Sequence, residues 1–254
     1  MKLTADQIQM NWVEFMSNID TYISSPRKEQ LTKFYEKYAE RIMLMPAAHK
    51  KEYHSAFPGG YVDHVNRVVK AALSMSAVWE GFGCDMTTFT IEELAFSAIN
   101  HDLGKMGDSN HEAYIPQTDK WRKDKLGEDY MFNKELAFSA VPDRGLFLLQ
   151  DNNIKYTFNE MVAIQTHDGL YDSANEKGYM PEQKPRTSLP FILHQADMMA
   201  ARIEFEIEWL PKFKNNLDTS KNNFTLGNNK KTSTKNKALG SIKSEGLQNI
   251  FDKL

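Results

Sequence analysis

Four segments of the sequence place histidine or aspartate side chains inside largely apolar stretches. These groups are His64, His101 with Asp102, His167, and His194 with Asp197. Burying imidazole and carboxylate groups is costly unless they are paired or bind a metal ion. Together the two kinds of ligand suit a divalent ion such as Mn, Fe, Mg, Co or Zn, with open positions left for water. The sequence therefore predicts a metal site to which several helices contribute.

The context of the individual residues supports this prediction. His101 and Asp102 close the apolar stretch LAFSAIN, and His64 lies beside a stripe of valines. His194 and Asp197 are three residues apart on an expected helix, so both side chains can point to the same side. Each of these histidine and aspartate side chains is therefore expected to face the interior of the protein, where a charged side chain needs an oppositely charged group or a metal ion beside it.

The order of these motifs resembles the HD-domain metal-dependent phosphohydrolase superfamily. A histidine follows a Gly-Gly turn in GGYVDHV, and HDLGK, THDG and LHQAD come after it along the chain. The likeness covers about residues 53–205 and is strongest to the branch that includes 3′→5′ exoribonuclease-like proteins. It implies an α-helical bundle in which one metal ion is held by His64, His101, Asp102 and Asp197. It also implies that Lys105 contacts a substrate phosphate and that Asp102 orients the attacking water.

A second ion and a proton donor are left open by this interpretation. Relatives with two metal ions usually carry a His-His pair where this sequence has Thr166 and His167. One firmly held ion is therefore expected, and a second stays open. The candidates for a second-metal ligand or a general acid are His111, His167 and His194. His49 and His54 are expected to be structural or surface residues.

Two long polar connections are expected to contribute substrate contacts. One lies between His101 and Asn133 and the other follows His167, and loops of this length in a compact domain are commonly functional. The cations that can neutralise phosphate are Lys105, Arg122, Lys123, Lys184 and Arg186. The aromatic side chains that can stack on a base are Tyr114, Trp121 and Tyr171.

Local signals predict the helices that position these groups. Capping boxes at Thr4 and Thr90 start two helices, and Ser25-Pro26 starts another that runs to about residue 45. The other expected helices span about 61–81, 133–149, 157–167 and 188–209, and the helix begun at Thr90 ends near 104. No segment alternates apolar and polar residues long enough to predict a strand. The expected fold is all-α, with a single core formed by residues 1–210.

Charge is distributed unevenly along the 254 residues, which carry 31 basic and 34 acidic side chains. Residues 211–254 hold nine lysines against three acidic residues, a net charge of +6, so residues 1–210 carry −9. An acidic body repels a long nucleic acid, and a small nucleotide-like substrate is expected instead. Residues 214–237 are rich in Asn, Lys, Thr and Ser, which predicts that 211–254 is a flexible tether. Its terminal GLQNIFDKL could dock on a protein partner as a short amphipathic helix.

General features of the sequence predict a cytoplasmic protein. No apolar run is long enough to span a bilayer, and the N-terminus lacks the apolar stretch of a signal peptide. The single cysteine, Cys84, excludes an internal disulfide framework. The sequence leaves open whether the protein forms a homo-oligomer.

Three functions are consistent with these features. The expected one is a metal-dependent phosphohydrolase: a nucleotidase, a deoxynucleoside triphosphate hydrolase or a phosphodiesterase for cyclic nucleotides. The second is a di-iron oxygenase of the same superfamily, which needs about six ligands. Its ligands would be His64, His101, Asp102, His167, His194 and Asp197. The third is a protein that docks on a partner through the C-terminal peptide.

Overall fold

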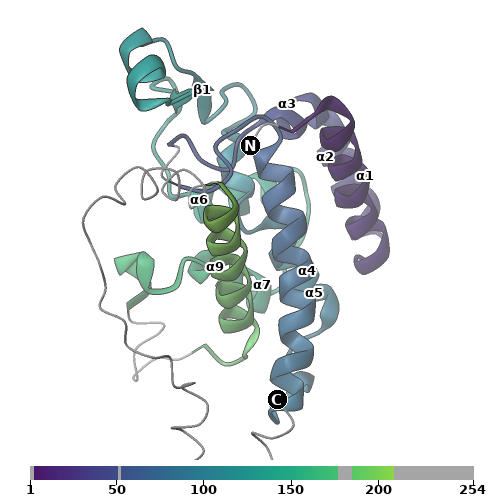
Figure 1. Cartoon of the computed structure of the whole chain (residues 1–254). Helices are drawn as coiled ribbons and strands as arrows, with labels where there is room; N and C mark the ends of the chain where they lie inside the picture. The colour runs from purple at the N-terminus through teal and green to yellow at the C-terminus, as the bar shows by residue number, and fades with distance from the viewer. Residues whose placement is uncertain (1–2, 51–52, 177–184, 209–254) are drawn as a thin grey trace, which may run out of the picture. The chain divides into compact units, whose positions relative to one another are not determined.

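The first unit of the chain is built mainly from helices (Figure 1). The computed structural model describes residues 3–50, 53–176 and 185–208. Contacts divide the chain into two compact units, Met1–Pro211 and Lys212–Leu254. The expected tether at 211–254 and its terminal peptide lie outside the described residues. Within the described part, no helix is both long and apolar enough to cross a membrane.

The helical class agrees with the expected all-α fold. The main helices are α1 Ala5–Tyr22, α2 Arg27–Lys37, α3 Ala39–Leu44, α4 Gly60–Gly81, α5 Ile91–Asn100, α6 Val141–Asp151, α7 Phe158–Thr166 and α9 Leu189–Glu208. The shorter helical turns are η1 Met86–Thr88, η2 Leu103–Met106, η3 Arg122–Leu126, η4 Gly169–Tyr171 and η5 Ser173–Asn175. The two strands are β1 Tyr114–Pro116 and β2 Tyr130–Phe132.

Three helices begin with the same hydrogen-bonded cap. Thr4, Thr90 and Thr157 each accept a hydrogen bond from the backbone N–H three residues on, and the Gln or Glu at that position bonds back to the threonine N–H. This exchange satisfies two backbone donors that a helix start leaves without partners. The caps predicted at Thr4 and Thr90 are confirmed.

Other boundaries differ from those expected. The helix expected over 133–149 begins only at Val141. Pro142 has no backbone N–H to donate, so it is tolerated in the first turn of a helix but not in the interior of one that began at residue 133. The helix expected from Pro26 to residue 45 is divided at Tyr38 into α2 and α3. The expectation of no strand is wrong, since β1 and β2 pair antiparallel with Ile115 opposite Met131. Each strand has three residues, which is too short for an alternating pattern to be seen in the sequence.

Helix α4 lies at the centre of the unit, between α9 and α1 (Figure 1). It also packs on α5, while α7 packs on both α5 and α9. The valine stripe of α4, which includes Val65 and Val68, is fully buried, as are Leu94 of α5 and Leu193 of α9. Because these helices bury their apolar faces together, polar groups on the same faces are forced into the interior.

The turn η2 packs so closely on the start of α6 that it has no room for a side chain at Gly104. A Cβ atom at this position would lie 2.0 Å from the carbonyl oxygen of Val141. We expect Gly104→Ala to lower the free energy of unfolding by about 1–3 kcal/mol, since the backbone must shift. Gly81→Ala is the control, because nothing lies within 4 Å of its Cβ. Urea denaturation followed by circular dichroism measures both variants, and equal stability would contradict the close packing.

Candidate metal centre

Four predicted ligands converge where α4, α5 and α9 meet. His64 comes from α4, His101 and Asp102 follow directly on α5, and Asp197 comes from α9. His64 Nε2 lies 3.2 Å from Asp197 Oδ1 and 3.7 Å from Asp102 Oδ2. His101 Nε2 lies 3.4 Å from both His64 Nε2 and Asp102 Oδ2. Their ligand atoms therefore point at one another inside the protein.

The histidine rings are oriented through their other nitrogen. His101 Nδ1 donates to the Ala98 carbonyl oxygen at 2.8 Å, and His167 Nδ1 donates to the Ile164 carbonyl oxygen at 2.8 Å. Each histidine follows the last residue of its helix and caps a carbonyl three residues back, where helix carbonyls lack partners. Because a carbonyl oxygen only accepts, Nδ1 of each ring carries a proton, and Nε2 is the nitrogen that faces the cluster.

His64 is oriented by a carboxylate that the sequence analysis missed. Its Nδ1 lies 3.2 Å from Glu204 Oε1, and Glu204 is buried on α9. Glu204 also accepts a hydrogen bond from Ser55 Oγ at 2.9 Å. Asp197 and Glu204 are seven residues apart, which is two helical turns, so they share one face of α9. That spacing is the signal by which Glu204 could have been found.

The separations between these ligand atoms fit binding of one ion. Two atoms that each lie about 2.1 Å from an ion in a tetrahedral arrangement are about 3.4 Å apart. Ligand atoms of His64, His101 and Asp197 all lie within 4.8 Å of one another, as do those of His101, Asp102 and His167. These buried groups are close enough to hold a metal ion.

The two oxygens of Asp102 face different histidines. Oδ2 is near His64 and His101, whereas Oδ1 lies 3.6 Å from His167 Nε2. Asp168 joins a further group with His167 and Asp197. Asp102 is therefore positioned between two sets of ligands, and His167 is the one candidate for a second ion that joins the cluster within the described residues.

Opposite charges compensate the burial of these groups. Burial alone raises the pKa of Asp102, but Lys105 and His101 outweigh it and hold the pKa well below its usual value. Lys105 Nζ donates to Asp102 Oδ2 at 2.5 Å. Burial lowers the pKa of His64, but Glu204 and Asp197 more than offset this and raise it to about 10. Each buried charge thus has a partner of opposite sign.

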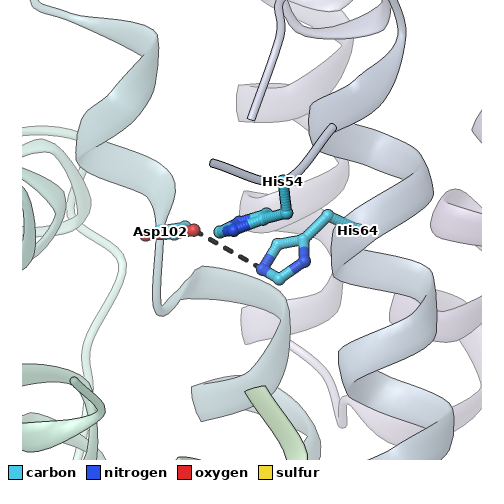
Figure 2. Close-up of side chains that lie close together, drawn as sticks. All are labelled: His54, His64 and Asp102. Atoms are coloured by element: carbon cyan, nitrogen blue, oxygen red, sulfur yellow. Dashed lines mark ion pairs between the residues drawn. The ribbon is translucent and has the colours of Figure 1, made fainter. Parts of the chain in front are cut away.

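His54 also lies beside the cluster, although the sequence analysis assigned it no chemical role. Ligand atoms of His54, His64 and Asp102 lie within 4.8 Å of one another (Figure 2). Burial and the neighbouring His64 lower the pKa of His54 to about 3. No spacing in the sequence marks this residue, because it precedes α4 in an irregular segment.

The other histidines proposed for chemistry lie elsewhere. His194 Nδ1 donates to the carbonyl oxygen of His167 at 2.7 Å. His111 is partly exposed and pairs with Asp108 at 3.2 Å. Neither joins a group close enough to hold an ion in the part of the chain that the structure describes.

Some of the residues expected to contact substrate line a cavity, and others do not. Lys105 and Tyr114 line a cavity of about 540 Å³, and Tyr171 lines another of about 1000 Å³ that Asp197 and His54 also border. Arg122, Lys123, Trp121 and Arg186 are exposed and line neither of these cavities. Lys184 lies outside the described residues.

Comparisons with known proteins add nothing to this geometry. No family model, no curated protein and no solved structure matches the chain. The likeness to HD-domain proteins therefore rests on the sequence motifs, and the chemistry rests on the arrangement of side chains.

A divalent ion should stabilise the folded protein, because a ligand that binds only the folded state raises the unfolding temperature. We expect Mn²⁺ or Co²⁺ at 100 times its dissociation constant to add about 2.7 kcal/mol. His101→Ala should abolish this gain, whereas His111→Ala should retain it. Thermal unfolding with and without metal measures the effect. Equal gains in both variants would contradict the assigned ligands.

Proposed function

We propose that the protein is an HD-type metal-dependent phosphohydrolase that cleaves phosphate esters of nucleotides or small cyclic nucleotides. The observation that carries the proposal is that His64 and His101 each lie within 3.9 Å of both Asp102 and Asp197, with Lys105 in contact with Asp102. A set of two imidazoles and two carboxylates is typical of sites that bind Mn, Fe, Co or Zn. A bound divalent ion would acidify a water molecule and neutralise phosphate oxygens, which is what phosphate hydrolysis requires.

The side chains around the ion have separate tasks. Asp102 can hold the ion through Oδ2, which faces the ligand histidines, and orient the attacking water through Oδ1. Lys105 reaches Asp102 and also lines the smaller cavity, so its ammonium can bind a phosphate oxygen there. His167 can hold a proton at Nε2 for the leaving alkoxide, because Asp102 and Asp168 offset burial and raise its pKa to about 9.

The larger cavity is suited to an uncharged ring. Met75 of α4 and Met198 and Met199 of α9 line it together with Tyr171. Thioether and aromatic side chains form adaptable apolar walls that accept the face of a base. Since Asp197 borders the same cavity, a base bound there would place its phosphate near the cluster.

The charges around the larger cavity favour a substrate with few phosphates. Asp168, Asp197 and Glu206 line it, and Arg202 Nε is engaged with Glu206 Oε1 at 3.0 Å. Asp197 would be compensated by the ion, and Arg202, the one lysine or arginine in the described part of the lining, is already engaged with Glu206, so the extra charges of a triphosphate would lack a partner. A nucleoside monophosphate or a cyclic mononucleotide fits this charge pattern better.

The placement of His194 argues against the di-iron oxygenase. That reaction needs a larger set of ligands, and His194 joins no group of side chains close enough to hold an ion in the part of the chain that the structure describes. The phosphohydrolase needs only the four converging ligands. Partner docking through GLQNIFDKL stays a prediction, because this peptide lies outside the described residues.

Hydrolysis is tested with a panel of nucleotides and Mn²⁺, Mg²⁺ and Co²⁺ added in turn. We expect release of phosphate, or opening of a cyclic diester, and a loss of at least about a hundredfold in Asp102→Asn, since an ion ligand is changed without altering shape. His111→Ala serves as the control and should retain activity. Absence of turnover, with two tightly bound irons in the purified protein, would favour the oxygenase.

Lys105 should contribute to phosphate binding through its charge. A hydrogen bond to a charged group contributes about 1.5–3 kcal/mol, so Lys105→Met should lower kcat/KM by about 10- to 150-fold. Lys123→Met removes a lysine on the exposed turn η3 and should leave kcat/KM unchanged. Steady-state kinetics compares the two variants, and equal effects would exclude a local role for Lys105.

A further inference from the structure

One imidazole at the metal centre has a buried nitrogen without a partner. Three buried side-chain atoms of the described residues lack a hydrogen bond: His54 Nε2, Tyr61 Oη and Ser97 Oγ. Leaving such an atom unpaired is destabilising, so a native protein normally supplies a partner, a water or an ion. Only His54 of these three is a residue type that binds metals strongly.

The position of His54 points to an ion as the missing partner. Its ring centroid lies 4.4 Å from that of His64. Figure 2 shows the ring directed into the space beside His64 and Asp102, and ligand atoms of the three residues lie within 4.8 Å of one another. His54 borders the larger cavity, yet its Nε2 is buried. The nitrogen is thus turned away from solvent and is not presented to a substrate.

The backbone that carries His54 is held in an unusual conformation. Ser55 has φ +50°, in the left-handed region, which is unfavourable for a residue other than glycine. The strain is maintained by specific contacts: Ser55 Oγ donates to Glu204, and its carbonyl oxygen accepts from Ala47 N–H at 3.0 Å. Gly60 permits the turn, since a Cβ there would lie 2.0 Å from the Ser55 carbonyl oxygen.

Glu204 connects this turn to the metal centre. One of its oxygens holds His64 Nδ1 and the other holds Ser55 Oγ. The same buried carboxylate therefore fixes the orientation of one predicted ligand and of the residue next to His54. The strained turn at Ser55 is therefore anchored on the same carboxylate that orients His64. This shared anchor suggests that the turn serves to position His54 at the candidate centre.

We propose that His54 is an additional ligand of the metal ion, delivered by the segment before α4. The proposal rests on the metal centre of the proposed function and extends its ligand set to three imidazoles and two carboxylates. Mg²⁺ prefers oxygen ligands, whereas Mn, Fe, Co and Zn accept imidazole readily. His54 therefore shifts the centre towards transition-metal ions and away from Mg²⁺.

Cobalt titration of the metal-free protein tests the role of His54. We expect His54→Ala to bind Co²⁺ at least tenfold more weakly than the unaltered protein and to change the visible absorption of the bound ion. The preference for Co²⁺ over Mg²⁺, measured by competition, should fall as well. The control is His49→Ala, because His49 lies five residues earlier and packs on Tyr114 and Phe132 instead; it should bind Co²⁺ normally.

The outcomes separate this proposal from the metal centre itself. An unchanged affinity and spectrum in His54→Ala would overturn the proposal and leave the centre intact. Failure of the unaltered protein to bind Co²⁺ would overturn both. His54→Leu retains bulk at the position, and its metal-free form should melt no lower than the unaltered protein because an unpaired polar atom is removed. Loss of folding in both variants would show a structural role and would also overturn the proposal.

Discussion

The candidate metal centre depends on the burial of carboxylates and imidazoles in the middle of an apolar core. His64 and His101 have no exposed surface, and Asp102 has 3%. Unpaired charges in such a place would be strongly destabilising, so each must be compensated. Lys105 compensates Asp102, Glu204 holds His64, and backbone carbonyls hold the other histidines. The Nε2 atoms of His64 and His101 each lie within 3.9 Å of both Asp102 Oδ2 and Asp197 Oδ1, which leaves a space that a divalent cation could occupy.

The fold meets this requirement by combining rigid helices with capped helix ends. His101 and His167 both follow the last turn of a helix, where the carbonyls without partners accept a hydrogen bond from the ring. His64 of α4 and Asp197 of α9 lie within regular helices instead, and side chains of the facing helix hold them: Glu204 contacts His64, and His64 contacts Asp197. Asp102 immediately precedes the η2 turn and Lys105 lies within it, so a shift of this turn would displace both side chains. The tight contact at Gly104 limits such changes.

The surroundings of the centre divide into two regions with different chemistry. Lys105 borders the smaller cavity, whereas Asp197 and the methionines of α9 border the larger one. A cation beside one region and an apolar wall beside the other are the basis for proposing a substrate with a charged end and a ring. The exposed residues Arg122, Lys123 and Trp121 belong to the connection that contains the β1–β2 hairpin, and they are not needed for this arrangement.

The sequence by itself determined the local structure and most of the buried ligands. Capping boxes at Thr4 and Thr90 depend on residues three apart, so they can be seen without a fold. His64 and Asp197 could be identified because a polar group on an apolar helix face must be buried with a partner. In the structure, His64 lies close to both Asp102 and Asp197. This proximity was expected from the resemblance of the motifs.

Only the tertiary structure decided which other residues join the centre. His54 lies in an irregular segment whose path depends on the turn at Ser55 and its bond to Glu204, a residue 149 positions away in the chain. His194 lies on the expected helix, but it joins no group close enough to hold an ion within the described residues. Loop cations and aromatics could not be assigned from spacing either, because a loop has no fixed periodicity and its position is set by contacts distant in the sequence.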